Sequence, residues 1–349
     1  MKGFKEYWKS ILGICLAIIL SFSSLNPSLV DHYYTNKLFQ YIRIVFDSIT
    51  SAISFPLFYL VLSGVLILLG FIILNKKNSR VSKLISMAGL FAWIYVLFYV
   101  LWGLNYSNSN IKTRLNLDAV SISETYLKDE IIKTIDSLAT IRNRINEDSF
   151  ALEVNYEIQE IIDLVRPDLE GVLMEAGYVV NRKPIIKLLS PKGFLLRIST
   201  AGFYFPFVGE GYIDKGLHSL QWPSTIVHEL AHGYGVTDEG ECNFIAILAC
   251  LRSDDPLIKY SGKLMYFQYL MSAIRGNKEL YKSMKSKIPK NIRKDLQAIY
   301  TELDKYPDLF PKVRNWIYDH YLRSNGVSEG IKSYGTVVKL MASYNFDHK

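Results

Sequence analysis

The first third of the chain is built around three long apolar segments, at residues 7–25, 51–74 and 84–104. None of them carries a charge in its central part. A helix of about 20 apolar residues is needed to cross the hydrocarbon core of a bilayer. The pattern therefore predicts three transmembrane helices, and it places a membrane domain at residues 1–105.

A second kind of pattern lies between the first two apolar segments. Five apolar residues recur there at helical spacing: Leu38, Ile42, Val45, Phe46 and Ile49. An apolar stripe on an otherwise polar helix is typical of a helix that lies in the membrane interface. An extension of the second apolar segment would give the same stripe, so both interpretations stay open.

After residue 105 the pattern becomes that of a mostly helical domain at residues 106–349. Helices are predicted at 115–150 and at 154–176, the second interrupted at Pro167. Residues 184–214 are rich in β-branched and aromatic residues and predict two or three short strands. Further helices are predicted at 223–234, 239–252, 256–275, 278–287, 290–305, 311–323 and 330–344. The expected fold class is mostly α (α+β), with a small β-sheet in the second domain.

Charge separates the two parts and orients the first. The formal net charge is +7, but residues 1–105 carry nine Lys and Arg against three acids, and the rest of the chain carries 31 against 30. No basic surface is therefore expected for nucleic acid. Lysines and arginines gather in the N-terminal tail and in the loop at 75–83, which predicts that both face the cytoplasm. Three crossings would then place residues after 105 outside the cytoplasmic membrane.

Cleavage of the first apolar segment is an open alternative. Ser21-Phe22-Ser23 matches the small-residue pattern of a signal peptidase site. The loop at 75–83 would still face inward in that case, so the second domain would still be extracytoplasmic. The three cysteines do not suggest a disulfide framework, and Cys242 is expected to be a small buried residue.

The chemistry is concentrated in His228-Glu229-Leu230-Ala231-His232. Residues four apart project from the same face of a helix, so both imidazoles can bind one metal ion. Two His nitrogens suit tetrahedral Zn²⁺. Glu229, rotated by about 100° on the helix, is expected to be the general base.

A catalytic zinc site of this type needs a third protein ligand. Asp238 is expected to cap a new helix whose first turns hold two acids, Glu239 and Glu241. Glu239 shares a face with Asn243, so Glu239 is favoured as the ligand, with Asn243 supporting a histidine ligand from behind. Glu241 is the alternative, and either acid could instead complement the helix dipole.

Weaker candidates lie upstream. Residues 202–210 could form a strand edge that pairs with an extended substrate, or could pack only for stability. Tyr204, Glu210 and His218 are candidates for this substrate edge or for stabilising an oxyanion. Further candidates for the oxyanion role are Tyr212, His320 and Tyr334.

Several of these segments carry a family resemblance. They are residues 102–106, 202–207 with Gly209 and Glu210, 228–232, 239–244, 318–322 and 333–334. With them the chain resembles an uncharacterised bacterial membrane family, domain of unknown function 3810. The resemblance implies an HExxH metallopeptidase behind three N-terminal spans. The helix after the motif is similar to the E-x-x-A-N pattern of gluzincin-type peptidases, which also favours Glu239.

Together these observations predict a zinc-dependent peptidase in the bacterial cytoplasmic membrane, with a zincin-like domain on the outer face. Its expected partners are the lipid bilayer and a peptide or protein substrate. The alternative hypothesis is a non-catalytic metal-binding envelope protein, in which the metal joins two helices and the domain serves as a structural or interaction module.

Overall fold

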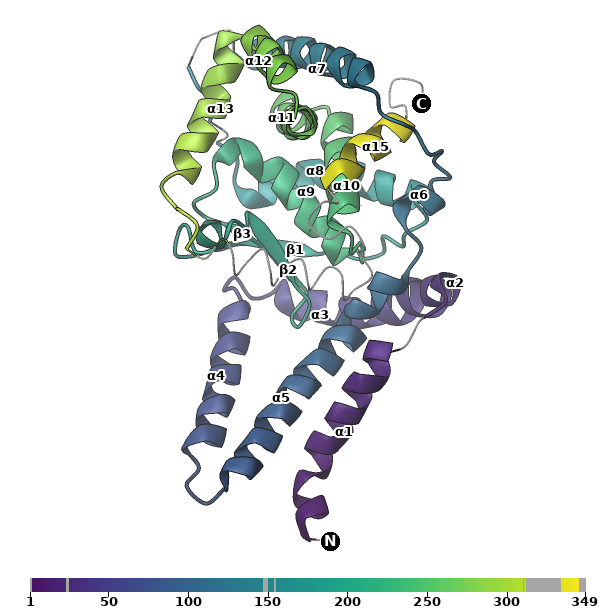
Figure 1. Cartoon of the computed structure of the whole chain (residues 1–349), viewed down its shortest axis with the longest axis vertical. Helices are drawn as coiled ribbons and strands as arrows, with labels where there is room; N and C mark the ends of the chain where they lie inside the picture. Colours follow the sequence, from purple (N-terminus) through teal and green to yellow (C-terminus); the bar gives the residue numbers. More distant parts are fainter. Residues whose placement is uncertain are drawn as a thin grey trace. The chain divides into compact units, whose positions relative to one another are not determined.

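The protein is mostly helical with one small three-stranded sheet, in agreement with the fold class that the sequence predicts (Figure 1). The computed structural model describes residues 2–22, 25–146, 150–153, 155–309, 311 and 334–344. The chain divides into two compact units. The first comprises residues 1–108 and 205–210, and the second comprises residues 109–204 and 211–349.

The first unit consists of helices and the tip of one β-hairpin. Its elements are α1 (Lys2–Phe22), α2 (Pro27–Leu29), the π-helix η1 (Val30–Leu38), α3 (Phe39–Thr50), α4 (Phe58–Leu74), α5 (Arg80–Leu101) and the 3₁₀ helix η2 (Gly103–Ser107). The hairpin tip is residues 205–210. The sequence did not predict that these six residues would pack with the first unit.

Among the described residues, one helix is both long and apolar enough to cross a membrane, namely α5 at Arg80–Leu101. The apolar parts of the other two expected spans are shorter, at Tyr7–Ser21 and Phe58–Leu74. The second expected span begins seven residues late, because residues 51–57 form a turn and a loop and α4 starts only after Pro56. The three transmembrane helices that the sequence predicts are therefore not confirmed, since only α5 reaches the required length and apolarity among the described residues.

Helices α1 and α5 pack closely because small residues lie where they cross. A Cβ atom on Gly89 would come 2.4 Å from Cβ of Ser10, and one on Gly13 would come 2.9 Å from the ring of Trp93. The indole nitrogen of Trp93 donates a hydrogen bond to the carbonyl of Lys9 at 2.9 Å. Close approach at small residues is the usual way in which apolar helices associate.

The second unit contains the remaining elements. They are α6 (Ile111–Arg114), α7 (Glu124–Ile145), α8 (Ile158–Glu175), β1 (Ile185–Leu189), η3 (Leu196–Ile198), β2 (Gly202–Phe205), β3 (Glu210–Asp214), η4 (Ser219–Gln221), α9 (Trp222–Gly233), α10 (Glu239–Arg252), α11 (Pro256–Ala273), α12 (Lys278–Lys287), α13 (Lys290–Leu303) and α15 (Tyr334–Tyr344). Helices α9 to α13 agree with the predicted bounds within two residues, whereas residues 312–323 of the helix predicted at 311–323 lie outside the described residues. Helix α7 is shorter than predicted, and α8 continues through Pro167 without the expected interruption.

Helix α10 is the centre of the second unit. Every residue from 240 to 250 is buried, because α8, α9, α11 and α15 surround the helix. A helix that is apolar all round is expected to be enclosed in this way. The sheet has the order β1-β3-β2, so β3 is its middle strand, and α9 packs against β1. Helices α7 and α12 lie on the side of the unit opposite the sheet (Figure 1).

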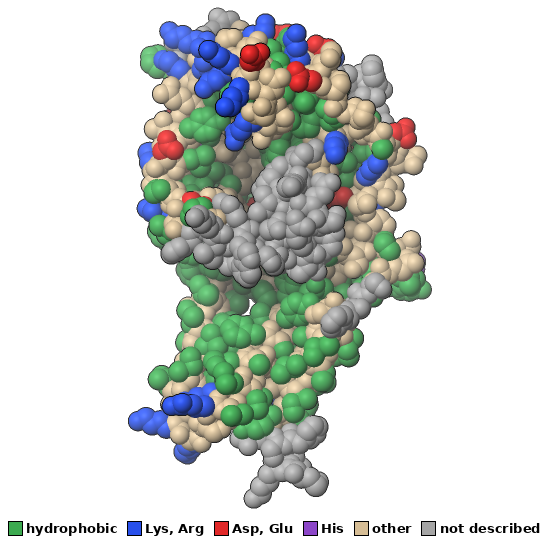
Figure 2. Space-filling model, in the orientation of Figure 1, with side chains coloured by type: hydrophobic (Ala, Val, Ile, Leu, Met, Phe, Trp, Pro, Cys, Tyr) green, Lys and Arg blue, Asp and Glu red, His purple; other side chains and the backbone are tan. Residues whose placement is uncertain are grey.

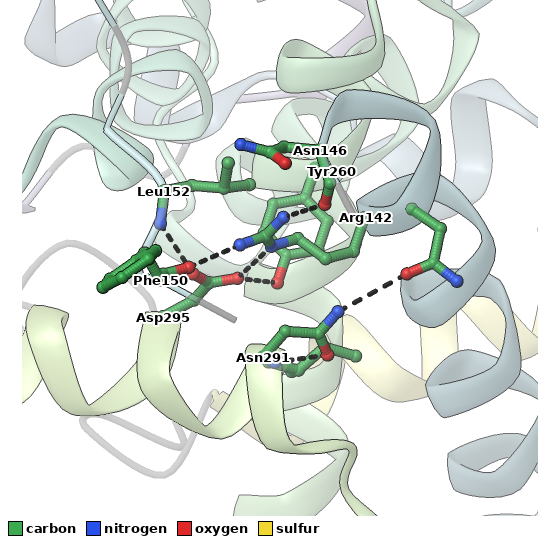
Figure 3. Close-up of polar contacts among 9 residues, drawn as sticks. Arg142, Asn146, Phe150, Leu152, Tyr260, Asn291 and Asp295 are labelled. Carbon is green, nitrogen blue, oxygen red and sulfur yellow. Dashed lines mark hydrogen bonds and ion pairs between the residues drawn. The ribbon is translucent and has the colours of Figure 1, made fainter. Parts of the chain in front are cut away.

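A buried ion pair joins helices at that opposite side. Nε of Arg142, on α7, lies 2.9 Å from Oδ2 of Asp295, on α13, and neither side chain is exposed (Figure 3). The hydroxyl of Tyr260, on α11, donates to the same carboxylate oxygen at 2.6 Å, and the backbone N–H of Leu152 donates to the other oxygen at 2.8 Å. Asp295 is therefore saturated with donors, which a buried carboxylate requires.

Candidate metal centre

Helix α9 presents the HELAH segment with its apolar side in the core. Ile226, Val227 and Leu230 are fully buried, and Pro223 lies in the first turn, where its missing N–H costs nothing. The helix ends at Gly233, whose carbonyl accepts a hydrogen bond from the guanidinium of Arg182. A cation at this position also suits the negative end of the helix dipole.

The turn that follows brings a second helix back to the histidines. Asp238 caps α10, and its carboxylate accepts the backbone N–H of Glu241 at 3.0 Å. Glu239 is the first residue of α10. Its Oε2 atom lies 3.1 Å from Nε2 of His228 and 3.6 Å from Nε2 of His232.

These three side chains form a cluster of metal-binding groups among the described residues. The two Nε2 atoms of His228 and His232 are 3.2 Å apart. Ligand atoms bound at about 2.0–2.1 Å to a tetrahedral Zn²⁺ are about 3.3–3.4 Å from one another. The three observed separations bracket that value, so the donor set fits a single ion of this size.

The far nitrogens of both imidazoles are held by α10 and by the turn before it. Nδ1 of His228 lies 2.8 Å from Oδ1 of Asn243, and Nδ1 of His232 lies 2.9 Å from the carbonyl of Val236. Because both partners are oxygen acceptors, a metal-bound form of either histidine would carry its proton on Nδ1. Each Nε2 would then offer its lone pair to the metal, which is the tautomer that a metal ligand needs.

Glu229 lies against strands β2 and β3, close to the three side chains of the cluster. It is 3% exposed, and its Oε2 atom has no hydrogen-bond partner among the described residues. Two strand glycines make room for it. A Cβ atom on Gly202 would come 2.8 Å from Oε1 of Glu229, and one on Gly211 would come 3.2 Å from its Cβ.

Burial and charge act in opposite directions on the two acids. Burial raises the pKa of Glu229 to about 7, although His228 and His232 act to lower it. A carboxyl whose pKa lies near neutrality is suited to exchange protons. Burial also acts to raise the pKa of Glu239, but the charges and hydrogen bonds of His232 and His228 outweigh it and hold that pKa well below its usual range. Glu239 is therefore an anionic donor.

The family model described as "Protein of unknown function (DUF3810)" matches residues 34–342. The chain belongs to this family. The match confirms the family that the sequence resembles, and it includes α3, α4, α5 and the whole cluster, while α1 lies before it. No curated protein and no solved structure matches the chain significantly.

Glu241, the alternative third ligand, does not join the cluster. Glu241 is buried, and its Oε1 atom accepts the backbone N–H of Ile111 at 2.8 Å, on the far side of α10 from the cluster. Cys242 is also buried, and its sulfur lies 3.4 Å from Nδ1 of His232, which is the nitrogen that faces away from the cluster. Neither side chain belongs to the donor set.

The weaker candidates for a substrate contact or an oxyanion contact have separate surroundings. His218 caps η4, where its Nδ1 accepts the N–H of Leu220 at 3.3 Å. Tyr204 is 9% exposed, and its ring lies 3.5 Å from where a Cβ atom of Gly233 would be. Tyr212 is buried against the ring of Phe203.

Glu210 belongs to the first unit and is fully buried there, which does not suit the substrate contact expected from the sequence. His320, the family segment at 318–322, residue 333 and the side chain of Tyr334 lie outside what the structure describes.

Sequence reasoning missed the two glycines that accommodate Glu229. A signal was present, because glycine is unfavourable inside a strand and often marks a close approach by another group. Gly202 and Gly211 both lie in the segment that the sequence predicts as strands. What the sequence does not reveal is which group approaches them.

Proposed function

We propose that this protein is a membrane-anchored zinc peptidase of the HExxH type. The observation that carries the proposal is the convergence of three donor atoms, 3.1–3.6 Å apart, beside the buried carboxylate of Glu229, one oxygen of which has no hydrogen-bond partner in the described part of the chain. His228, His232 and Glu239 would hold the zinc. The side chain of Glu239 is 28% exposed, so this donor is in contact with solvent.

Zinc, when bound, supplies Lewis acidity that polarises a peptide carbonyl and makes water more acidic. Glu229 would accept a proton from the attacking water at its carboxylate and deliver it to the nitrogen of the leaving amine. The water oxygen would bond to the carbonyl carbon first, and the C–N bond would break once its nitrogen has received the proton, so that Glu229 returns to its starting state. Such proton transfer typically contributes about 10²–10⁴-fold to a rate.

A peptide substrate is favoured by the position of β2. This strand is at an edge of the sheet, and its Gly202 lies against Glu229. An edge strand offers backbone N–H and C=O groups that pair with an extended chain. A peptide bound along β2 would thus be held close to the proposed base.

We propose that α1, α4 and α5 anchor the protein in the bacterial cytoplasmic membrane. Many apolar side chains are exposed on the face of this helical unit that Figure 2 shows, and α4 has no buried residue, as expected for a helix in contact with lipid. Lys76, Lys77 and Arg80 are exposed where α4 and α5 are joined. Positive charge marks the cytoplasmic side, so the second unit would be extracytoplasmic.

A non-catalytic metal site is the competing proposal, since the same three donors join α9 to α10. The position of Glu229 favours the enzyme. A purely structural site has no use for a buried carboxylate beside the metal, and burying an unpartnered carboxyl oxygen is costly. Groups that are buried at such a cost are often found in active sites, so the position of Glu229 supports a catalytic role.

The deciding experiment replaces Glu229 by Gln. This change keeps the shape and removes the base, whereas His228, His232 and Glu239 are untouched. We expect Glu229→Gln to retain zinc, measured by elemental analysis, and to lose hydrolysis of unfolded envelope proteins by at least about 100-fold. Equal hydrolysis or equal biological function in the two proteins, with zinc in both, would support the structural-metal proposal instead.

A further inference from the structure

The hairpin formed by β2 and β3 is shared between the two units of the chain. Its tip, residues 205–210, packs in the first unit, while the residues on either side of the tip pack in the second. Gly211, which accommodates Glu229, follows the tip directly, and Gly202 precedes it by three residues. Whatever holds the tip therefore bears on the strands that enclose Glu229.

Arg43 holds one side of the tip. This residue of α3 is fully buried, and its Nη2 atom donates a hydrogen bond to the carbonyl of Pro206 at 2.9 Å. Its guanidinium also lies over the ring of Phe46, 4.8 Å from the centroid. Burying a guanidinium without partners is costly. Loss of the contact with Pro206 would leave Arg43 with fewer partners, so this contact favours the packing of the tip against α3.

Gly209 permits that approach. A Cβ atom at this position would come 2.5 Å from Nη1 of Arg43 and 3.3 Å from Oδ1 of Asp47, which lies one turn further along α3. Its φ of +75° is also a value that residues with a side chain rarely adopt. The tip is thus shaped to receive the polar face of α3.

Glu210 holds the other side. It is fully buried, and its Oε2 atom accepts the backbone N–H of Leu57 at 3.0 Å. Leu57 precedes α4, and the ring of Phe58, the first residue of that helix, packs edge-on against Phe205 in the tip. A carboxylate that accepts a backbone N–H in a buried place makes a strong, directional bond.

We propose that Arg43 and Glu210 are positioning residues: they fix the tip of the β2–β3 hairpin and thereby restrain the residues that continue directly from the tip into its two strands, up to Gly202 and Gly211, which lie against Glu229. The effect on catalysis rests on the proposed peptidase function, whereas the effect on the hairpin does not.

The test uses the full chain in detergent micelles or nanodiscs and compares removal of each contact with its conservative replacement. Glu210→Ala and Arg43→Met remove the contacts. Glu210→Gln keeps an oxygen acceptor for Leu57, and Arg43→Lys keeps a donor for Pro206. Arg80→Met is the matched control, because Arg80 is an exposed arginine of the same unit.

Backbone hydrogen exchange is the first readout. We expect residues 202–214 to exchange about 5–10-fold faster in Glu210→Ala and Arg43→Met, as for the loss of one buried hydrogen bond. Exchange in α8, α10 and α11 and the zinc content should stay at wild-type levels. Glu210→Gln and Arg43→Lys should restore most of the protection, and Arg80→Met should not differ from wild type.

Turnover is the second readout. A displaced catalytic group commonly costs about 100-fold in rate, so we expect kcat to fall by about 10–100-fold in the two removing variants and to recover in the two conservative ones. Unchanged exchange at 202–214, or an increase spread evenly through the second unit, would overturn the proposal. If Arg43→Met does not fold, Gly209→Ala disturbs the same contact and is judged by the same criteria.

The two proposals can fail separately. A hairpin that loosens while Glu229→Gln and wild type hydrolyse peptides equally would refute the peptidase function and leave the positioning contact in place. A hairpin that does not respond, in a protein whose activity depends on Glu229, would refute the positioning role alone.

Discussion

Nδ1 of His228 lies 2.8 Å from Oδ1 of Asn243, so a side chain from the second turn of α10 stands directly behind the first histidine of α9. The same helix contributes Glu239 to the front of the cluster. Helix α10 thus has two functions in the proposed site, because one of its faces supplies a ligand and also fixes the tautomer of another.

The role of Asn243 predicts a loss of metal affinity when its oxygen is removed. Asn243→Leu keeps the volume and abolishes the acceptor, so His228 loses the group that orients it. Zinc should then bind about 10–100-fold more weakly, measured by competition with a chelator of known affinity. Cys250→Ala, on the same buried helix two turns away, is the control for altered packing. Equal losses in both variants would refute the specific role of Asn243.

The two acids of α10 predict different outcomes. Glu239→Ala removes a donor atom, and it should abolish stoichiometric zinc in the purified protein, as His232→Ala should. Glu241→Ala removes only the acceptor of the N–H of Ile111. It should retain about one zinc per chain and lower stability by about 1–3 kcal/mol, since a buried donor is left unpaired. Zinc loss in Glu241→Ala alone, by elemental analysis, would show that the third ligand was chosen wrongly.

The buried pair of Arg142 and Asp295 predicts a large stability effect far from the cluster. Asp295→Asn leaves the guanidinium of Arg142 without its anionic partner (Figure 3). The free energy of unfolding should fall by about 3–5 kcal/mol, measured by denaturant titration. Glu175→Gln breaks a pair in which Glu175 is 48% exposed to solvent. That variant should cost less than about 1 kcal/mol, and a similar cost for both would contradict the assignment.

Membrane topology can be tested through the loop that joins α4 and α5. The charge pattern predicts that this loop is cytoplasmic and that residues after Asn105 are outside. A reporter active only outside the cytoplasm should work when fused after Asn105 and fail when fused after Asn78. A cysteine at Asn78 should react with a membrane-impermeant reagent only after the cells are opened. The reverse pattern would refute the proposed localisation.

Elements of the second unit were predictable because their signals are local. The apolar face of α9, the proline in its first turn and the glycine at its end all lie within twelve residues. Asp238 likewise indicates the start of α10, because it is a typical N-cap residue. Two exceptions are informative. Helix α8 continues through Pro167, because packing of the residues on both sides outweighs one missing hydrogen bond. Gly202 and Gly211 indicate that another group comes close to the strands, but the sequence does not show that this group is Glu229.

The sequence by itself determined that His228 and His232 share one face of a helix, since the helical period alone decides it. It favoured Glu239 as the third ligand but left Glu241 open as the alternative, because both acids lie in the first turn of α10 and point about 200° apart. That choice depends on how α10 is rotated against α9. In the structure Glu241 accepts the backbone N–H of Ile111, a residue far away in the sequence. Only the tertiary structure brought Arg43 to the hairpin tip and buried Glu210 there. The reason is physical: periodicity defines the faces of each element, whereas the rotation and pairing of elements follow from packing among residues that are distant along the chain.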